Sequence, residues 1–431
     1  MWTTTLQLDP WRIAMTRLLG SVWQGAYFSK VAPLRVENLP RQPLPAATWV
    51  RVRNRLSGIC GSDLELISAE RDLRIAPAAL PGQHYYYPGR EVVGEVIEVG
   101  KKVQHIRVGN RVVLQHSPNC VSSGVIKLCR FCATGDYNLC EFGVLPGSQP
   151  IGGGWSEEML LPEQQLSSIP ASISDDQAVM IEPTAVALHA LLRCPPQAGE
   201  RVLIIGAGTI GLLLLHLLRT IAPQVEIAIL ARHPFQAEIA QRLGATHIVD
   251  TKKSYADIQR TTQARLYSGH FGNRLLIGGY DLIYDTIGKE KTLHDALRWA
   301  RANATVVLVG ISLRMMHIDL SPVWNQQIKL LGSTGHGNEM WPLGSREQRT
   351  TFSIVKELLE RELIHPEHLI THHFSLNDYQ DALTTALNKT SSRAVKVVFD
   401  HALLSATVVA PNRTALGTKP LITSQGPRRA L

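Results

Sequence analysis

Four cysteines lie close together in the sequence and could hold a metal ion. They fall within 21 residues, with the spacing Cys129-x₂-Cys132-x₇-Cys140 and with Cys120 nine residues before Cys129. Four thiolates can bind Zn²⁺ in the closed, tetrahedral arrangement of a structural site. A redox dithiol is the alternative for the C-x₂-C pair, but two further cysteines so near favour zinc in a reducing compartment. We therefore predict a structural zinc lobe at about residues 117–142.

A glycine-rich turn is the second motif with a chemical meaning. G-x-G-x-x-G follows the apolar run VLII and opens an apolar helix. In this context the three glycines allow a tight turn, a close approach of the backbone to a pyrophosphate, and close helix–strand packing. The motif predicts a dinucleotide site, against the alternative of a glycine-rich turn in another α/β fold. The residues expected to line this site are Gly206, Gly208, Thr209, Ile210, Gly211, His233 and Gly310.

The end of the following strand indicates which dinucleotide would bind. An NAD site usually carries an acidic residue there, which binds the ribose 2′-hydroxyl. This sequence has Ala231, Arg232 and His233 instead. Arg232 can pair with a phosphate, so we predict a preference for NADP over NAD. The alternative is that Arg232 is a solvated turn residue and leaves the specificity open.

The elements that must position these motifs change in character along the chain. Short strands with glycine breaks come first, which indicates a β-rich domain. After about residue 182, strands and helices alternate, as in a parallel doubly wound sheet. We expect an α/β fold with a β-rich domain over 1–183 and 333–400, a Rossmann domain over 184–332 and a tail over 401–431.

Residues 9–23 predict a helix with one apolar face. Trp11, Met15, Leu18 and Val22 recur at spacings of four and three. The expected role is a docking helix that packs on its own protein, and contact with a lipid surface is the alternative.

Composition and charge argue against several other classes of protein. The 431 residues are 45% hydrophobic and 19% charged, as in an ordinary globular enzyme. The formal charge of +8 is concentrated at the ends: residues 1–60 carry eight basic and two acidic side chains, and residues 401–431 carry four basic and none acidic. A nucleic-acid reader would carry its excess on a folded element, so we expect no nucleic-acid partner. Without a long apolar run or a secretory pattern, we expect no membrane span and a cytoplasmic location.

From about residue 45 to 400 the chain resembles the zinc-containing medium-chain dehydrogenases, which include alcohol, polyol and threonine dehydrogenases. The likeness rests on the four cysteines and on "GICGSDL" (58–64), "GREVVGEVIEVGKKV" (89–103) and "EPTAVALHALLR" (182–193). The family usually has two residues between the first two cysteines, where this chain has eight. The resemblance implies a GroES-like catalytic domain beside the Rossmann domain, hydride transfer between NAD(P)(H) and an alcohol/carbonyl pair, and a homo-oligomer, either dimer or tetramer. It also implies that Lys396 contacts the cofactor pyrophosphate.

The resemblance further implies a catalytic site built from these segments. Cys60 and Glu182 would be ligands of a catalytic zinc ion, and Ser62 would relay the substrate proton. Asp63 would orient a histidine ligand of the metal. Glu91 would lie behind the metal.

Arg90 is the position where this chain departs from the family. The family has histidine there, as the middle ligand of the catalytic zinc, whereas arginine stays protonated and has no lone pair to offer. At 4 Å and an effective dielectric constant of 20, its repulsion from a dication would approach about 8 kcal/mol. We therefore expect ordinary binding of a second, catalytic zinc to be abolished.

Three interpretations of Arg90 follow. In the first, its guanidinium replaces the metal, pairs with Glu182 and with a Cys60 thiolate, and polarises a substrate oxygen. In the second, His84 becomes a substitute ligand and Arg90 points away. In the third, the site is inactive and the chain only binds NADP. A zinc-free reductase of the same fold, acting on an enone or quinone, is the alternative activity.

Overall fold

The computed structural model describes residues 1–75, 85–143, 149–310 and 312–403. His84 and almost all of the expected tail lie outside these ranges. The described chain forms two compact units, the first made of Met1–Glu182 and residues 356–403, the second of Pro183–Val355. We expected the chain to return to the first domain near residue 333, whereas in this division it returns at Lys356.

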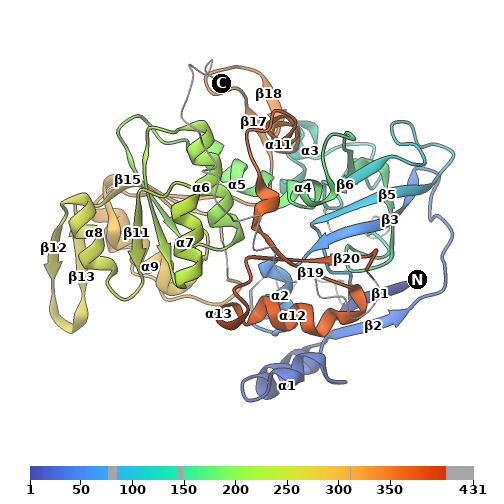
Figure 1. Ribbon diagram of the computed structural model, residues 1–431, viewed down its shortest axis with the longest axis horizontal. Helices are drawn as coiled ribbons and strands as arrows, with labels where there is room; N and C mark the ends of the chain where they lie inside the picture. Colours follow the sequence, from blue (N-terminus) through green and yellow to red (C-terminus); the bar gives the residue numbers. More distant parts are fainter. Residues whose placement is uncertain (76–84, 144–148, 311, 404–431) are drawn as a thin grey trace. The chain divides into compact units, whose positions relative to one another are not determined.

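The first unit is built on a seven-stranded sheet (Figure 1). Its strand order is β19-β20-β3-β5-β6-β8, with β7 paired to β3, and every pairing except that of β19 with β20 is antiparallel. Val50 and Val52 of β3 and Val92 and Val96 of β5 belong to one buried apolar cluster. The strands are β3 (Trp49–Gly58), β5 (Val92–Val99), β6 (Arg111–Leu114), β7 (Glu158–Pro162), β8 (Leu166–Ser168), β19 (Ile370–Phe374) and β20 (Lys396–Asp400).

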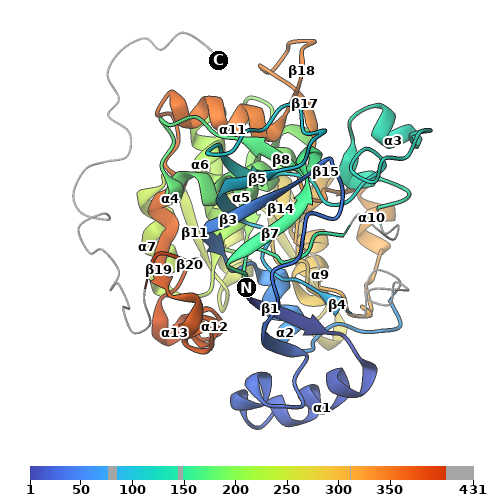
Figure 2. The same cartoon turned by 90° about the vertical axis from the view of Figure 1, so that its right-hand side faces the viewer.

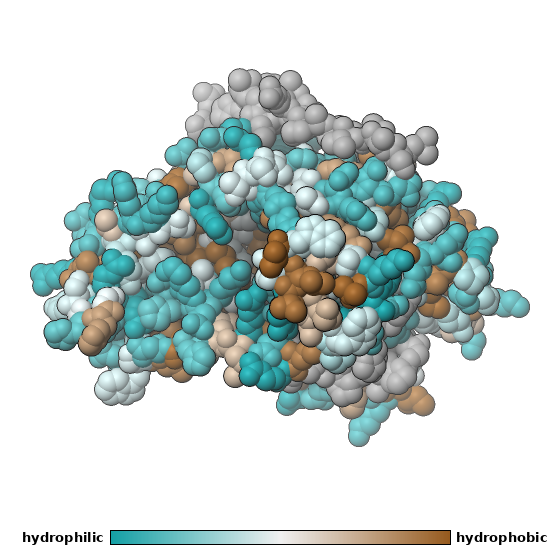
Figure 3. Space-filling model, turned by 90° about the horizontal axis from the view of Figure 1, so that it is seen from below, coloured by the Kyte–Doolittle hydropathy of each residue, from teal (hydrophilic) through white to brown (hydrophobic). Residues whose placement is uncertain are grey.

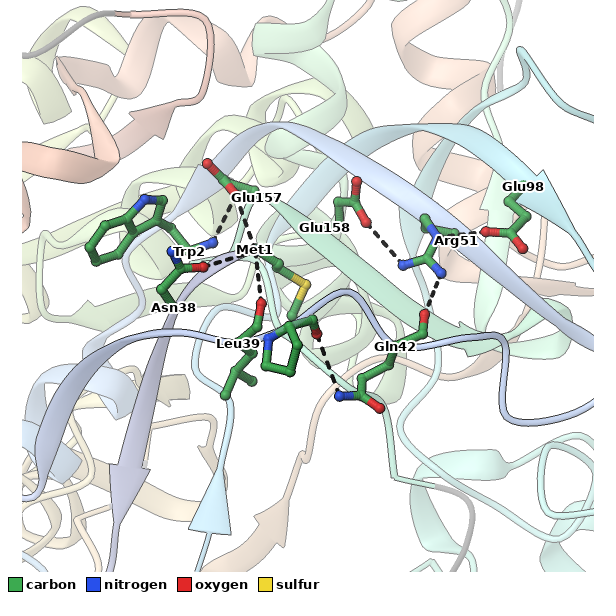
Figure 4. A network of polar contacts seen from close by, with 10 residues as sticks. Met1, Trp2, Asn38, Leu39, Gln42, Arg51, Glu98, Glu157 and Glu158 are labelled. Atoms are coloured by element: carbon green, nitrogen blue, oxygen red, sulfur yellow. Dashed lines mark hydrogen bonds and ion pairs between the residues drawn. The ribbon is translucent and has the colours of Figure 1, made fainter.

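Buried charge helps to fix the pairing of the central strand. Arg51 of β3 is only 2% exposed, and its guanidinium bonds to Glu98 at 2.7 Å and to Glu158 at 3.0 Å (Figure 4). These carboxylates come from β5 and β7, two of the three strands that pair with β3. In the same view the amino group of Met1 donates to the carbonyl of Leu39, which holds the chain start against the segment after β2.

A smaller sheet and short helices complete the first unit. The sheet has the order β2-β1-β4. Its strands are β1 (Trp2–Gln7), β2 (Leu34–Asn38) and β4 (Tyr85–Tyr86), and the helices are α1 (Pro10–Gly20), η1 (Gln24–Phe28), α2 (Gly61–Ile67), α3 (Arg130–Ala133), η2 (Tyr137–Leu139), η3 (Glu163–Gln165), α4 (Asp175–Val179), η5 (Pro366–Leu369), η6 (Leu376–Asp378), α12 (Tyr379–Leu387) and α13 (Lys389–Ser392).

Helix α1 differs from the expectation that it packs on its own protein through its apolar face. Ile13 and Thr16 are the buried residues of this helix. Trp11, Leu18 and the nearby Val22 are exposed. The spacing correctly placed these apolar residues on one face, but it did not reveal that the opposite face is the one that packs.

The second unit contains the expected parallel doubly wound sheet, with helices on both faces (Figures 1 and 2). The order β11-β10-β9-β14-β15-β16 is the 3-2-1-4-5-6 order of dinucleotide-binding folds. Its strands are β9 (Arg201–Ile205), β10 (Glu226–Ala231), β11 (His247–Asp250), β14 (Tyr280–Asp285), β15 (Ala300–Leu308) and β16 (Lys329–Gly332).

The remaining elements of this unit connect or flank that sheet. Helices α5 (Ile181–Arg193) and α11 (Thr351–Glu360) carry the chain from one unit to the other. The others are α6 (Thr209–Ile221), α7 (Pro234–Arg242), α8 (Ser254–Thr262), η4 (His270–Gly272), α9 (Glu290–Trp299), α10 (Ser321–Asn325) and the hairpins β12–β13 (Arg265–Ser268, Arg274–Ile277) and β17–β18 (Asn338–Met340, Gln348–Thr350). None of the helices in the described ranges has the length and apolar character needed to cross a membrane.

Candidate active site and metal centre

The four cysteines of the predicted lobe converge in the first unit. Their sulfur atoms all lie within 4.8 Å of one another, and those of Cys120 and Cys140 are 3.7 Å apart. Sulfurs bound tetrahedrally to zinc at 2.3 Å would be separated by about 3.8 Å, so the donor set fits this ion. The backbone N–H of Cys132 lowers the pKa of the Cys129 thiol to about 6, which favours the thiolate that a metal needs. The cluster therefore supports a structural zinc site.

The start of helix α2 brings three of the predicted catalytic residues together. Cys60 is the N-cap of this helix, and its backbone N–H donates to the Asp63 carboxylate at 3.1 Å. Asp63 is fully buried at the third position of the helix, so it closes the turn that presents Ser62. Arg90, just before β5, donates from Nη2 to Ser62 Oγ at 2.7 Å.

Glu91 and Lys396 form an ion pair in the interior behind this turn. Their charged atoms are 2.5 Å apart, and each side chain is only 2% exposed. Strand β20, which begins with Lys396, pairs with β3 and brings the two residues together. A Cβ atom on Gly58 would lie 2.0 Å from a Glu91 oxygen, so glycine makes room for the carboxylate. The Lys396 ammonium is thus bonded to Glu91 in the interior of the first unit, and its contact with the cofactor pyrophosphate stays a prediction.

Acidic groups surround Arg90, although its side chain still reaches solvent. Burial lowers the pKa of Arg90, but interaction with the ionised forms of Cys60, Tyr86, Asp63 and Glu182 raises it by more, so the pKa is raised and the guanidinium stays charged. Burial and the nearby Glu91 raise the pKa of Glu182 to about 7, against the effect of Arg90. Burial likewise raises the pKa of the Cys60 thiol.

The predicted ligands of a catalytic zinc, Cys60 and Glu182, are not among the side chains that cluster as metal ligands in the described ranges. Within the described part of the chain, the four-cysteine cluster is the only set of three or more His, Cys, Asp or Glu side chains close enough to hold an ion. Cys60, Asp63 and Glu182 instead share their surroundings with a permanent cation. The substitute ligand considered from the sequence, His84, lies outside the described residues.

The glycine-rich turn in the second unit has the shape that a pyrophosphate requires. Gly206 has φ +103°, a conformation that side chains disfavour. A Cβ atom on Gly211 would lie 1.9 Å from the carbonyl oxygen of Gly206, so only glycine allows helix α6 to approach β9 this closely. Gly208 caps α6 without a side-chain hydrogen bond, and nothing lies within 4 Å of its Cβ direction. The backbone N–H groups of the first helical turn have no intrahelical partner, and such a helix start suits an anion.

The other predicted cofactor residues follow the ends of β10 and β15. Arg232 is exposed directly after β10 and makes no ion pair with any residue in the described ranges. His233 is the N-cap of α7, and its ring stacks on Phe235. Gly310 lies so close to the turn after β14 that a Cβ atom would be 2.4 Å from the carbonyl oxygen of Thr286.

Sequence reasoning missed two residues at these sites. Asp285, fully buried at the end of β14, accepts hydrogen bonds from the backbone N–H groups of Ile287 and Gly288 and shapes the turn beside Gly206. The acid at the end of the buried run "YDLIYD" was the available signal. Lys389 is the second: burial, and then the charge of Lys396, lower its pKa. No local pattern marks Lys389.

Comparisons with known proteins match both units. Residues 46–171 match the alcohol dehydrogenase GroES-like domain, and residues 209–347 match the zinc-binding dehydrogenase domain. Sorbitol dehydrogenase of Arabidopsis thaliana is 28% identical over 81% of this chain and 88% of its own length. The crystal structure of 2R,3R-butanediol dehydrogenase from Bacillus subtilis has a TM-score of 0.65 and 26% identity, over 85% of this chain and 96% of its own. An Escherichia coli CFT073 alcohol dehydrogenase complexed with NADH has a TM-score of 0.67 and 25% identity, over 85% and 95%.

A GroES-like domain joined to a Rossmann domain with a glycine-rich turn defines a nicotinamide-dependent oxidoreductase, and the expected α/β fold is confirmed. The chain belongs to the zinc-containing medium-chain dehydrogenase family. It is an alcohol dehydrogenase-like enzyme of the type that acts on CH–OH groups.

Proposed function

We propose that this enzyme transfers a hydride reversibly between NADP(H) and an alcohol/carbonyl pair of a polyol-like substrate, with the Arg90 guanidinium in place of a catalytic zinc ion. The observation that carries this proposal is the 2.7 Å hydrogen bond from Arg90 Nη2 to Ser62 Oγ. The substrate class comes from relatives named for sorbitol and butanediol.

The residues around Arg90 divide the work of such a reaction. The bound nicotinamide supplies or accepts the hydride. Arg90 stabilises the negative charge that develops on the substrate oxygen, as a positioned cation does. Ser62 accepts its hydrogen bond from Arg90, so its own proton remains available for the substrate oxygen. Asp63 holds the turn that carries Ser62, through the hydrogen bond that its carboxylate accepts from the backbone N–H of Cys60.

A catalytic zinc does not fit this arrangement. Arg90 offers no lone pair, and its charge would repel a dication among the same carboxylate and thiol groups. The structural zinc at the four-cysteine lobe is unaffected by this argument. We therefore propose one zinc ion per chain.

Zinc content tests the proposal without relying on activity. Elemental analysis of the purified protein should give one zinc per chain, and the Arg90→His variant should bind a second through the restored imidazole. The control variant Arg90→His/Cys60→Ser should return to one, because it lacks the thiolate ligand. Two zinc ions in the unmodified protein would refute the proposal, and so would an Arg90→His variant that gains none.

For the cofactor, we propose NADP with Arg232 as the residue that pairs with the 2′-phosphate. Its support is the exposed guanidinium directly after β10, with no acidic residue beside it. A hydrogen bond to a charged group contributes about 1.5–3 kcal/mol, so Arg232→Gln should weaken NADPH binding by roughly 10- to 150-fold and leave NADH binding unchanged. Arg346→Gln, which changes another exposed arginine of the same unit, is the matched control. Equal binding of NADPH by both variants would contradict the assignment.

Reduction of an enone or quinone by the same residues is the second candidate. It is favoured by the same guanidinium, because a fixed cation stabilises an enolate oxygen as well as an alkoxide. Rates on a panel of polyols, ketones, enones and quinones distinguish the two activities. Tight NADPH binding without turnover on any of them would indicate an inactive site. A homo-oligomer and a cytoplasmic location stay predictions from the family and the sequence.

A further inference from the structure

Helix α1 and the turn after it carry the most apolar exposed segment of the first unit. Side chains of large apolar residues point outward here, and Figure 3 shows apolar side chains gathered on the face where α1 lies. Val22 is 90% exposed, Leu18 66% and Trp23 62%. Contiguous apolar patches on a folded protein usually mark a surface that binds something. We call this set the α1 patch: Trp11, Met15, Leu18, Leu19, Val22 and Trp23.

The α1 patch is held in place by bonds from the other side of the helix. The guanidinium of Arg17 donates to the carbonyl oxygen of Ala69 at 3.0 Å, and Arg12 donates to that of Lys30, also at 3.0 Å. The side-chain amide of Gln24, after the patch, is bonded to that of Asn388. These hydrogen bonds attach α1 to the first unit. The apolar side chains are therefore exposed on a helix that is already packed against the protein.

The segment that carries the α1 patch has more basic than acidic residues. Residues 9–30 contain Arg12, Arg17 and Lys30 against the single acid Asp9, which pairs with Arg12 at 3.3 Å. The guanidinium of Arg12 also lies 4.5 Å from the centre of the Trp11 ring. Two tryptophans, Trp11 and Trp23, flank the aliphatic side chains along the chain. Tryptophan is enriched where protein meets the headgroup region of a bilayer, and basic residues attract anionic headgroups.

We propose that the α1 patch binds the surface of a membrane that contains anionic phospholipids. The helix would lie in the plane of the interface, with its aliphatic side chains among the acyl chains and the exposed Lys30, whose carbonyl bonds to Arg12, at the headgroups. Figures 1 and 2 both show α1 at the edge of the first unit. The side chains of the α1 patch are uncharged and, apart from the indole N–H groups of Trp11 and Trp23, carry no hydrogen-bond donor. This favours lipid over a protein partner, because protein interfaces carry about one hydrogen bond per 100–200 Å².

Vesicle sedimentation with the whole chain tests this proposal. Protein should sediment with phosphatidylcholine vesicles that contain phosphatidylglycerol at least about tenfold more than with phosphatidylcholine alone, and high salt should remove the difference. Leu18→Glu/Val22→Glu should lower binding by at least about tenfold, since it places two charges where acyl chains would lie. Val108→Glu, which changes a 60% exposed apolar residue elsewhere in the first unit, should bind as the unmodified protein does.

Other outcomes overturn the proposal. Absence of binding by the unmodified protein would do so, as would binding that Leu18→Glu/Val22→Glu retains. If that double variant instead lowers the molar mass measured by light scattering, the α1 patch is an interface between copies of this chain. Circular dichroism and zinc content show whether the double variant is folded. Should it not fold, quenching of tryptophan fluorescence in the unmodified protein by brominated lipids gives a second test, and no quenching beyond that of a Trp11→Phe/Trp23→Phe variant would count against the proposal.

Discussion

Replacing Lys396 with methionine removes the positive charge that faces Glu91 in the interior of the first unit. The two charged atoms are 2.5 Å apart, and both side chains are 2% exposed, so water cannot take the place of the ammonium. Breaking one side of a buried pair costs about 3–5 kcal/mol, because the remaining charge stays buried without a partner. The carbonyl of Ile59 also loses its hydrogen bond from Lys396. We expect the Lys396→Met variant to lose about 3–5 kcal/mol of the free energy of unfolding of this unit.

Urea unfolding of the single and double variants measures the loss in free energy of unfolding and shows its origin. Thermal unfolding gives a second measure: Lys396→Met should lower the thermal midpoint by about 10 °C, at 2–4 °C per kcal/mol for a unit of this size. Glu91→Gln/Lys396→Met should be more stable than Lys396→Met alone, because it leaves no unpaired charge in the interior. A loss below about 1 kcal/mol in the single variant, or a double variant no better than it, would refute the reasoning.

Three further predictions concern the two candidate sites. Arg90→Met should lower kcat/KM by about 10²–10³-fold, the usual effect of removing one donor to a developing oxyanion, and a rate within threefold of the original would contradict its role. Burial and Glu91 raise the pKa of Glu182 from 4.5 to about 7, so its contribution to stability is complete below pH 4.5 and is lost as the pH rises through 7. Glu182→Gln should therefore flatten the pH dependence of the free energy of unfolding in that window by up to about 3 kcal/mol, as urea titrations at several pH values would show. Cys132→Ser should lower the zinc content from one per chain to none and lower the thermal midpoint, measured by elemental analysis and calorimetry, and retained zinc would contradict the four-thiolate site.

Local patterns were enough to predict the parts of the molecule whose geometry is set within a few residues. The turn at Gly206–Gly211 depends on backbone φ angles and close approaches that glycine alone permits. The cysteines at 120–140 are near neighbours in the chain, so their convergence follows from short loops. The alternation of strands and helices after residue 182 predicted the parallel sheet for a similar reason, because the spacing of apolar residues within each segment indicates whether it is a strand or a helix.

Contacts between distant parts of the chain could not be predicted in this way. Lys396 lies 305 residues from Glu91, and only the pairing of β20 with β3 brings them together, so its position in the sequence suggested a different partner. For α1, the period showed which residues share a face but not which face is covered, because Ile13 and Thr16 give a weaker signal than the large side chains opposite. Asp285 was missed because its role is to accept hydrogen bonds from the backbone of a turn, and the spacing of apolar residues does not indicate such bonds.

The bond between Arg90 and Ser62 has a consequence for how this site could fail. An ion bound by side chains can be lost by dilution, by acid or to a competing chelator, and the site then stays empty until another ion binds. A guanidinium attached to the backbone is present as soon as the chain folds, and its charge does not depend on the supply of any metal in the cell. In the reaction that we propose, this position therefore has no empty form, cannot be filled with the wrong metal, and loses its charge only by mutation.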